Sequence, residues 1–294
     1  MLAVLGPTAS GKTSTAIEIA LHLGAEIISV DSMQVYRGMD VGTAKPTVIE
    51  RRGVPHHLID VVEPEAEFSV ADFRRLGRQV IEDATTPVVI IGGSGLHFRA
   101  LVDPMSFAPT DDALRAELEE RDLDAMASEL VQLDPDAGQH VDLANKRRVV
   151  RALEVALLTG ETPSGRAASA EAEELKRYVP ELEFRAVGLD AGTGTDERID
   201  ERLDEMRQGG LVEEVHRLRD RLGRTARTAV GYREVLQHLE GALTVDEAFE
   251  AIRHNTRKLA KKQRTWFQRD PRIHWIPWMD NESDRVERVM EILS

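Results

Sequence analysis

The sequence predicts an α/β fold in which helices cover a parallel sheet and a helical segment interrupts the sheet-forming part of the chain. Three observations lead to this prediction. A glycine-rich turn follows a short apolar run at the amino terminus, further apolar runs alternate with helical patterns, and a long helix-like stretch separates the fourth run from the fifth. A chain of 294 residues is long enough for one large or two modest domains with cores of their own.

The glycine-rich turn, Gly6–Thr13, fits the P-loop pattern G-x-x-x-x-G-K-[ST] and follows the apolar run Leu2–Leu5, which is typical of a buried strand. A strand that turns sharply into a helix leaves backbone N–H groups unpaired and directs the positive end of the helix dipole at phosphate oxygens. Lys12 would neutralise the terminal phosphate, and the Thr13 hydroxyl would ligate a magnesium ion. The pattern predicts a P-loop NTPase-like sheet and a phosphorylated ligand, but it does not choose among kinases, NTPases and other users of pyrophosphate groups.

A second apolar run, Glu26–Val30, predicts a buried strand that carries Asp31 at its carboxyl end. Open α/β sheets bind their ligands at this edge. Two roles for Asp31 follow from the residues alone. It could act as a general base, or it could be a Walker B aspartate that holds magnesium through water.

The later elements suggest that the sheet is built from both ends of the chain. The remaining strand candidates are His57–Val61, Val88–Ile91, Glu183–Leu189 and Ile273–Ile276. Because the stretch from Thr110 to Lys176 is almost entirely helix-like, we expect a core at 1–107 and 186–294 and a helical insertion domain at 108–185. A capping-box pattern at Thr244–Glu247 then predicts the start of a C-terminal helix.

The charge distribution bears on nucleic-acid binding. The formal net charge is −14, with 52 acidic and 38 basic residues, which at first sight argues against a nucleic-acid partner. The distribution of the charges matters more than their sum, because no acidic residue occurs from Ala251 to Arg269. Two basic clusters are candidate phosphate-contacting faces: Arg253, Arg257, Lys258, Lys261, Lys262, Arg264 and Arg269, and before them Arg217, Arg219, Arg221, Arg224, Arg227 and Arg233.

Several classes of protein are excluded or disfavoured by composition. The chain has no cysteine, so disulfides, thiolate metal sites and a thiol nucleophile play no part. No apolar stretch approaches the roughly 20 residues of a membrane span, and the first residues enter a strand at once, which leaves no room for a signal peptide. We expect a cytoplasmic protein without a membrane partner, acting as a monomer.

Several motifs together resemble one enzyme family over nearly the whole chain. The motifs are Gly6–Thr13, Asp31–Tyr36, Gly38–Pro46, Gly92–Leu96, Ala71–Phe73, Arg148–Glu154, Val230–Arg233 and Thr256–Trp266. On these residues the chain resembles the tRNA dimethylallyltransferases, also called tRNA isopentenyltransferases. The resemblance implies transfer of a dimethylallyl group from dimethylallyl diphosphate to N6 of adenosine 37 beside the tRNA anticodon, with Mg²⁺ as cofactor and the tRNA anticodon stem–loop as partner.

The resemblance also implies roles for individual residues. Asp31 becomes the general base, and Arg202 occupies the position of a diphosphate-binding arginine, so that Asp31, Thr13 and Arg202 are the predicted catalytic residues. Arg198 lies i,i+4 from Arg202 and could clamp the same diphosphate. The other reading pairs both arginines with Glu201, Asp204 and Glu205 on a solvated helix face. The predicted diphosphate contacts are Gly6, Thr8, Ala9, Ser10, Gly11, Lys12, Thr13, Arg198 and Arg202.

The positions that resemble tRNA contacts form a larger set, in which Gln34 is suited to an adenine edge. They are Asp31, Ser32, Met33, Gln34, Ser94, Arg115, Arg147, Arg148, Arg151, Thr228, Gly231, Tyr232, Arg233, Lys261 and Lys262. The chain departs from the family at two places, where His97 replaces a tyrosine after Gly92-Gly93-Ser94-Gly95-Leu96 and Gln268 replaces an arginine. We expect a structural role for His56 and His57, and packing roles for Trp266, Trp275 and Trp278.

Three other functions remain open at this point. A related prenyltransferase could act on free adenine nucleotides, although a nucleotide-sized acceptor would not need the helical insertion and the basic C-terminal helix. A P-loop small-molecule kinase would bind ATP and carry a lid rich in arginine. A non-catalytic RNA-binding P-loop protein would leave Asp31 without a chemical role.

Overall fold

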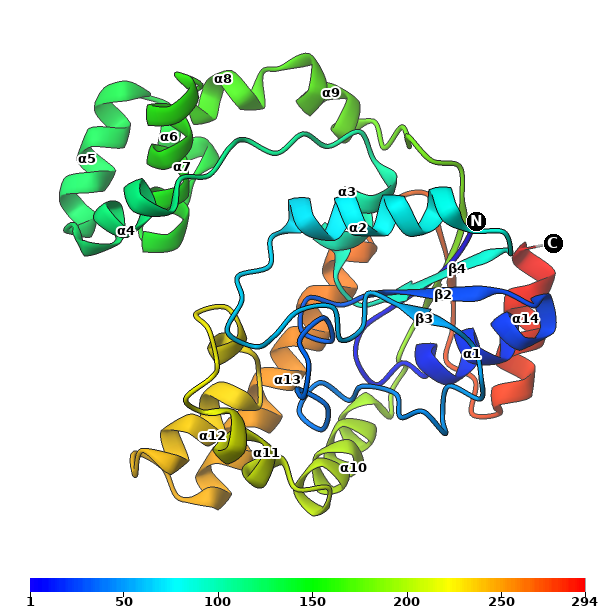
Figure 1. Cartoon of the computed structure of the whole chain (residues 1–294). Coiled ribbons are helices and arrows are strands. Elements are labelled where there is room, and N and C mark those ends of the chain that lie inside the picture. Colours follow the sequence, from blue (N-terminus) through cyan, green and yellow to red (C-terminus); the bar gives the residue numbers. More distant parts are fainter. Residues whose placement is uncertain (294) are drawn as a thin grey trace. The chain divides into compact units, whose positions relative to one another are not determined.

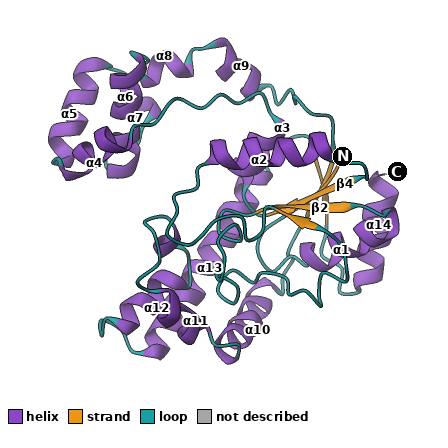
Figure 2. Ribbon diagram, in the orientation of Figure 1, coloured by secondary structure: helices purple, strands orange, loops and turns teal. Residues whose placement is uncertain are grey.

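The computed structural model describes residues 1–293 and divides into two compact units. The first unit joins Met1–Val102 to the chain from Leu182 onward, and the second unit is Asp103–Glu181 (Figure 1). The first unit contains the sheet, and the second is entirely helical (Figure 2).

All six strands of the sheet run parallel, in the order β3-β2-β4-β1-β5-β6. They are β1 (Leu2–Leu5), β2 (Glu26–Val30), β3 (His56–His57), β4 (Val88–Gly92), β5 (Arg185–Leu189) and β6 (Ile273–Ile276). Because the strands are parallel, the segments that follow β1, β2 and β4 leave the same edge of the sheet. The predicted α/β class with a parallel, helix-covered sheet is confirmed.

The third predicted strand is largely wrong. Only His56 and His57 pair with β2, and His57–Val61 does not continue as a strand. Leu58 and Asp60 have φ angles of 61° and 56°, a left-handed conformation that interrupts an extended strand. The backbone there pairs with a different segment instead, since the N–H groups of Asp60 and Val61 donate to the carbonyls of Gln34 and Val35.

Two hydrophobic clusters cover the two faces of the sheet, and strand periodicity sorts residues between them. In β4, Val88 and Ile90 belong to one cluster while Val89 and Ile91 belong to the other, as expected for a strand whose side chains alternate between faces. Helices α1 (Lys12–Leu23) and α14 (Glu282–Leu293) lie together over the face of Val89 (Figure 1). The opposite face is covered by α2 (Val70–Asp83), α3 (Gly95–Val102) and α13 (Val245–Phe267).

A group of helices after β5 completes the first unit. It comprises α10 (Thr195–Gln208), α11 (Leu211–Leu218), the short 3₁₀ turn η1 (Ala226–Thr228), α12 (Tyr232–Leu239) and α13. The predicted capping box at the start of α13 is confirmed, because the Thr244 side chain accepts from the Glu247 N–H at 3.2 Å and the Glu247 carboxylate accepts from the Thr244 N–H at 2.8 Å.

The second unit has a small core of its own. Its helices are α4 (Asp112–Glu120), α5 (Leu123–Leu133), α6 (Ala137–His140), α7 (Lys146–Thr159), α8 (Pro163–Ala167) and α9 (Ala170–Lys176). Leu118, Met126, Leu130, Val149 and Leu153 form its buried centre. Within residues 1–293, no helix combines the length and the apolar character that crossing a membrane would need.

Candidate active site

The P-loop is shaped to receive an anion. Gly11 is the N-cap of α1 in a left-handed conformation, with φ of 72°, and no side chain caps the helix. The first-turn N–H groups of α1 are thus left without a side-chain acceptor, and the positive end of the helix dipole lies at the loop. Ala9 also has a positive φ, 60°, which is rare for alanine and indicates a loop that the surrounding structure holds in place.

Two basic side chains converge on this loop. The Lys12 Nζ donates to the Pro7 carbonyl at 3.0 Å, and Arg202 Nη1 donates to Thr8 Oγ1 at 2.8 Å. Burial and the positive charge of Arg202 lower the pKa of Lys12 to about 8, while the negative charge of Asp31 acts in the opposite direction. Burial likewise lowers the pKa of Arg202, whose guanidinium nevertheless stays charged. Two cations held close together favour an anionic ligand.

Arg198 also reaches the P-loop, but it contacts the backbone. Its Nε donates to the Ala9 carbonyl at 3.0 Å, and Nη2 donates to the Ala191 carbonyl. Its guanidinium lies 3.6 Å from the centre of the Trp278 ring. Within the described part of the chain, neither Arg198 nor Arg202 forms an ion pair with a carboxylate, so the solvated-face reading of these two residues does not hold.

Asp31 follows β2 and is oriented by its own turn. Its Oδ1 accepts the N–H groups of Met33 at 2.8 Å and Gln34 at 3.3 Å. Over residues 1–293 no hydrogen bond falls on Oδ2. The negative charge of Asp31 opposes the lowering of the pKa of both Lys12 and His97. One oxygen is therefore held in position and the other is open to a ligand.

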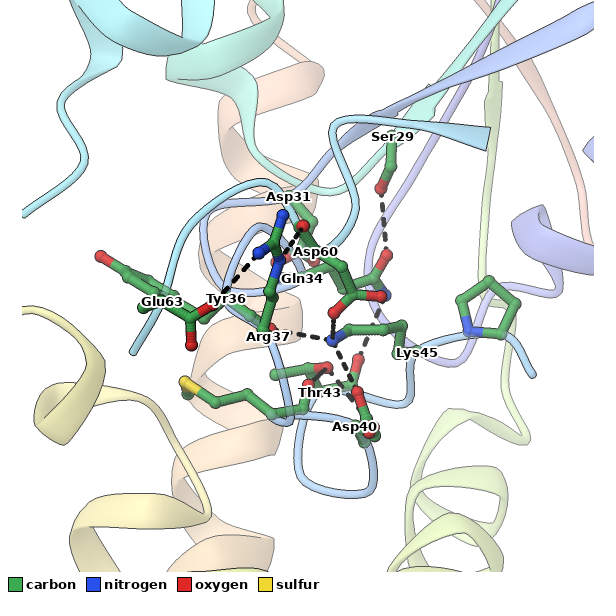
Figure 3. A network of polar contacts seen from close by, with 12 residues as sticks. Ser29, Asp31, Gln34, Tyr36, Arg37, Asp40, Thr43, Lys45, Asp60 and Glu63 are labelled. Carbon is green, nitrogen blue, oxygen red and sulfur yellow. Dashed lines mark hydrogen bonds and ion pairs between the residues drawn. The ribbon is translucent and has the colours of Figure 1, made fainter. Parts of the chain in front are cut away.

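The Gln34 amide is engaged within the protein (Figure 3). Its Oε1 accepts the Ser29 hydroxyl at 3.0 Å, and its Nε2 donates to the Thr43 carbonyl at 3.2 Å. The amide links the turn after β2 to the loop around Thr43, and this geometry does not leave it open to an adenine edge. Ser32 and Met33, in the same turn, are partly exposed.

Lys45 is a buried anchor that the sequence alone did not reveal. Its Nζ lies 2.6 Å from Asp40 Oδ1, 2.6 Å from Asp60 Oδ1 and 2.9 Å from the Tyr36 carbonyl oxygen (Figure 3). Its side chain is only 3% exposed. The contact to Asp60 explains in part why the chain leaves strand geometry after His57.

Tyr232, predicted as a tRNA contact, is fully buried. Its hydroxyl donates to Glu214 Oε1, and burial raises the pKa of Tyr232, so the hydroxyl keeps its proton. Its ring packs so tightly against Gly42 that a Cβ there would lie 2.5 Å from it. Gly231 precedes α12 with a φ of 97°, and its N–H donates to Glu234. Tyr232 and Gly231 therefore pack against the loop around Gly42.

Ser94 lies in the glycine loop after β4, and His97 lies in the first turn of α3. The Ser94 Oγ lies 2.7 Å from His97 Nδ1, and burial lowers the pKa of His97 although Asp31 opposes this effect. Helix α13 crosses this loop and the P-loop, since Gln263 Oε1 accepts the Thr8 N–H at 2.8 Å and the Trp266 indole covers Gly95. Trp266 is 41% exposed, so it is only partly the packing residue that we expected. Gln263 was missed because a glutamine within a basic helix carries no distinctive signal.

The basic residues divide into free and paired groups. Lys261 and Lys262 on α13 are exposed, and no ion pair holds either of them within the described chain. The second basic cluster is largely neutralised, as in Arg221, which pairs with Glu63 and Glu65, and Arg233, which pairs with Glu234. The Thr228 hydroxyl donates to the Thr225 carbonyl at 2.8 Å.

In the helical unit, Arg147 and Arg148 are exposed in the first turn of α7. Arg115 and Arg151 are instead bound to the fully buried Glu154, at 2.8 Å and 2.6 Å. The Arg115 ion pair joins α4 to α7, whereas the Arg151 ion pair lies within α7. Both lower the pKa of Glu154 despite its burial.

No cluster of three or more histidine, aspartate or glutamate side chains is arranged for a metal ion in residues 1–293. Magnesium does not require such a cluster, because it usually keeps several waters and takes one or two protein ligands beside phosphate oxygens. The Thr13 side chain, at the start of α1, is partly exposed and makes no hydrogen bond within the described residues. It therefore fits the protein ligand of a phosphate-bound magnesium ion.

Comparison with known proteins identifies relatives along the whole chain. The IPP transferase family model matches residues 34–270. The chain is 44% identical over 307 aligned residues to a tRNA dimethylallyltransferase of Bifidobacterium longum, and the alignment covers 100% of this chain and 90% of that protein.

Solved structures show the same relationship. The structure is similar to the full-length tRNA isopentenylpyrophosphate transferase of Bacillus halodurans, with a TM-score of 0.71, 36% identity and coverage of 99% of this chain and 93% of the other. It also matches a eukaryotic dimethylallyltransferase acting on tRNA, with a TM-score of 0.81, 24% identity and coverage of 97% and 77%. At that identity, the second likeness shows the fold.

Proposed function

The chain belongs to the IPP transferase family, and we propose that it transfers a dimethylallyl group from dimethylallyl diphosphate to N6 of adenosine 37 in tRNA, releasing diphosphate. One observation carries this proposal within the family. The open Oδ2 of Asp31 shares a sheet edge with a P-loop where Lys12 and Arg202 lie together without a carboxylate bonded to either in the described residues. A base and an anion site side by side suit the displacement of a diphosphate by an amine.

The reaction joins the N6 nitrogen to the first carbon of the dimethylallyl group. The N6 lone pair forms the new C–N bond, and the C–O bond to diphosphate breaks with its electron pair leaving on the diphosphate. N6 must lose a proton, and Asp31 Oδ2 accepts it. Because Oδ1 is held by Met33 and Gln34, the carboxylate keeps its orientation as the proton arrives.

The leaving group gains negative charge in the transition state, and the P-loop is built to stabilise it. Lys12, Arg202 and the first N–H groups of α1 would bind the diphosphate oxygens. A magnesium ion held by Thr13 would supply further positive charge. Arg198 would act from behind the loop by holding the carbonyl of Ala9.

The acceptor adenosine must leave its stack in the anticodon loop before it can reach Asp31. Phosphate contacts would position the RNA, and the exposed Lys261, Lys262, Arg147 and Arg148 suit that task.

The proposal is tested by incubating the protein with magnesium, dimethylallyl diphosphate and unmodified tRNA, followed by nucleoside mass spectrometry. AMP and ATP serve as parallel acceptors. A mass gain on a tRNA adenosine alone is the expected result. A gain only on a free nucleotide would move the activity to prenyltransferases of nucleotides, and phosphoryl transfer or ATP hydrolysis without prenylation would contradict the proposal.

A further inference from the structure

A buried carboxylate holds the loop that follows Asp31. Glu214, on α11, is only 3% exposed and receives four hydrogen bonds. Its Oε2 accepts the N–H groups of Asp40 at 3.0 Å and Val41 at 2.9 Å, and its Oε1 accepts the Gly42 N–H at 3.1 Å and the Tyr232 hydroxyl. Three consecutive N–H groups converging on one carboxylate form an anion-binding nest.

The charge of Glu214 is compensated by these donors. Within residues 1–293, no lysine or arginine forms an ion pair with it. A buried charge without an ion-pair partner is tolerated only where hydrogen bonds replace its hydration. The carboxylate and the bent loop around Gly42 therefore stabilise each other, and either one alone would be unfavourable.

The nest is linked to the proposed base through Thr43 and Gln34, which Figure 3 shows together with Asp31. Thr43 follows Gly42, and its carbonyl accepts from the Gln34 side-chain amide at 3.2 Å. The Gln34 backbone N–H in turn donates to Asp31 Oδ1 at 3.3 Å. Lys45 ties the same loop a second time through Asp40, at 2.6 Å. Glu214 is thus joined to Asp31 through a short series of direct contacts.

We propose that Glu214 is a positioning residue for the transfer reaction. It holds residues 40–45, and through Gln34 the Asp31 carboxylate, in the place that the acceptor adenosine requires. This inference rests on the proposed function, because it assigns Glu214 to the acceptor side of that same site. The P-loop makes no hydrogen bond to Glu214, so its substitution should leave diphosphate binding intact.

Two variants distinguish positioning from general packing. Glu214→Gln keeps the shape but turns an NH₂ group toward N–H or O–H donors, which no longer find an acceptor. Glu214→Ala leaves the nest empty. Since a displacement of about 1 Å at a reacting group can lower a rate by roughly 100-fold, we expect kcat/KM for tRNA to fall by about 10- to 100-fold in both variants, while the Kd for inorganic diphosphate stays within about twofold.

The matched control is Asp270→Asn. Asp270 is another buried carboxylate of the same unit, but it receives its hydrogen bonds from Arg272, just before β6. The start of β6 lies at the sheet edge opposite to Asp31, because the strands are parallel. This variant is expected to lower thermal stability without changing the kinetic constants for tRNA.

Formate rescue tests the nest directly. Formate can occupy the cavity of Glu214→Ala, and we expect it to restore much of the lost transfer rate and to leave Tyr232→Phe unaffected. Amide hydrogen exchange in residues 38–46 should be faster in Glu214→Ala and slow again with formate. The exchange measurement does not depend on activity, so it tests this inference separately from the proposed function. A failure of the proposed function would appear instead as wild-type protein that transfers no dimethylallyl group.

Two outcomes would overturn the inference. One is wild-type transfer kinetics in both Glu214 variants. The other is a loss of transfer together with an equal loss of diphosphate binding, where formate restores neither and Asp270→Asn has the same effect. That pattern would indicate general unfolding and not a displaced loop.

Discussion

At the scale of single residues, the two carboxylate oxygens of Asp31 have different roles. Oδ1 of Asp31 is used for structure, since it accepts two backbone N–H groups of its own turn. Oδ2 has no partner in the described chain and is left for chemistry. Asparagine can keep the first task, because its side-chain oxygen accepts the same bonds, but it cannot take a proton.

We therefore expect Asp31→Asn to keep diphosphate binding and to lose transfer. A positioned general base contributes about 10²- to 10⁴-fold, so the single-turnover rate with saturating tRNA should fall by that factor. Calorimetry with inorganic diphosphate provides the control for an intact P-loop. A near-normal rate in this variant would show that Asp31 is not the base.

The lowered pKa of Lys12 predicts a pH dependence of diphosphate binding. The free protein loses the Lys12 charge as the pH rises through about 8. A bound diphosphate favours the protonated lysine and raises its pKa, so affinity is full below this pH and falls above it. If only the protonated form binds, the Kd rises by about tenfold between pH 7 and pH 9.

Calorimetric titration with diphosphate at several pH values measures this dependence. Lys12→Met should bind diphosphate more weakly than the wild type at neutral pH. Its affinity should not show the decrease that begins near pH 8 in the wild type. A wild-type affinity that stays flat up to pH 9 would mean that Lys12 is not a diphosphate contact.

At the scale of elements, α13 braces two of the loops that carry the site. Gln263 accepts the N–H of Thr8 in the P-loop, and one turn further the Trp266 indole covers Gly95 at the start of α3. A Cβ at Gly95 would lie 1.7 Å from Trp266 Cδ1, a distance at which the indole must move. The glycine is needed here for close approach.

Gly95→Ala is therefore expected to destabilise the fold by about 1–3 kcal/mol, as overpacking usually does. Chemical denaturation measures the change. Gly138→Ala is the matched control, since a Cβ added at Gly138 would meet only a Leu143 side-chain carbon, at 3.4 Å. The loss of stability in the double variant Gly95→Ala, Trp266→Ala should be smaller than the sum of the losses in the two single variants. Strict additivity would argue against a steric overlap between the added Cβ and the indole.

The C-terminal helix supports the P-loop from another direction. Arg285 on α14 lies against Gly11, where a Cβ would be 3.2 Å from its Nη2, and its guanidinium is 4.9 Å from the centre of the Trp278 ring. Arg198 occupies a position 3.6 Å from the same ring centre. Two cations around one indole therefore connect α10 and α14 at the back of the loop.

At the scale of the whole molecule, a net charge of −14 must coexist with the proposed binding of tRNA. Ion pairs within the protein neutralise some basic side chains and leave others free to contact RNA. Carboxylates from other segments neutralise Arg221, Arg253 and Arg257, whereas Lys261 and Lys262 remain exposed. Fewer free cations should contact phosphates than the sequence count of basic residues suggests.

The double variant Lys261→Ala, Lys262→Ala should weaken tRNA binding. If both lysines contact phosphates, the slope of log K against log salt should become shallower by about 1.4 to 1.8. Arg221→Ala is the control with a paired cation, and we expect its slope to match the wild type. Binding measured from low to moderate salt decides this, and an unchanged slope in the double variant would remove the lysines from the interface.

Much of the fold was predictable because it is encoded over short distances. The P-loop, the strands that flank it and the capping box of α13 depend on residues a few positions apart, and the structure confirms the α/β class and that capping box. The third strand failed for a tertiary reason. Leu58 and Asp60 adopt left-handed conformations where their segment pairs with the turn after β2 and with Lys45.

The sequence by itself predicted a phosphate-binding P-loop and placed Asp31 at a sheet edge, because strand periodicity and the backbone geometry of a P-loop are local properties. Only the tertiary structure decided how the site is held. Glu214 meets Val41 across 173 positions of sequence, and Gln263 meets Thr8 across 255. Such contacts depend on how distant elements pack, and a buried polar side chain takes whatever partner that packing brings within hydrogen-bond distance.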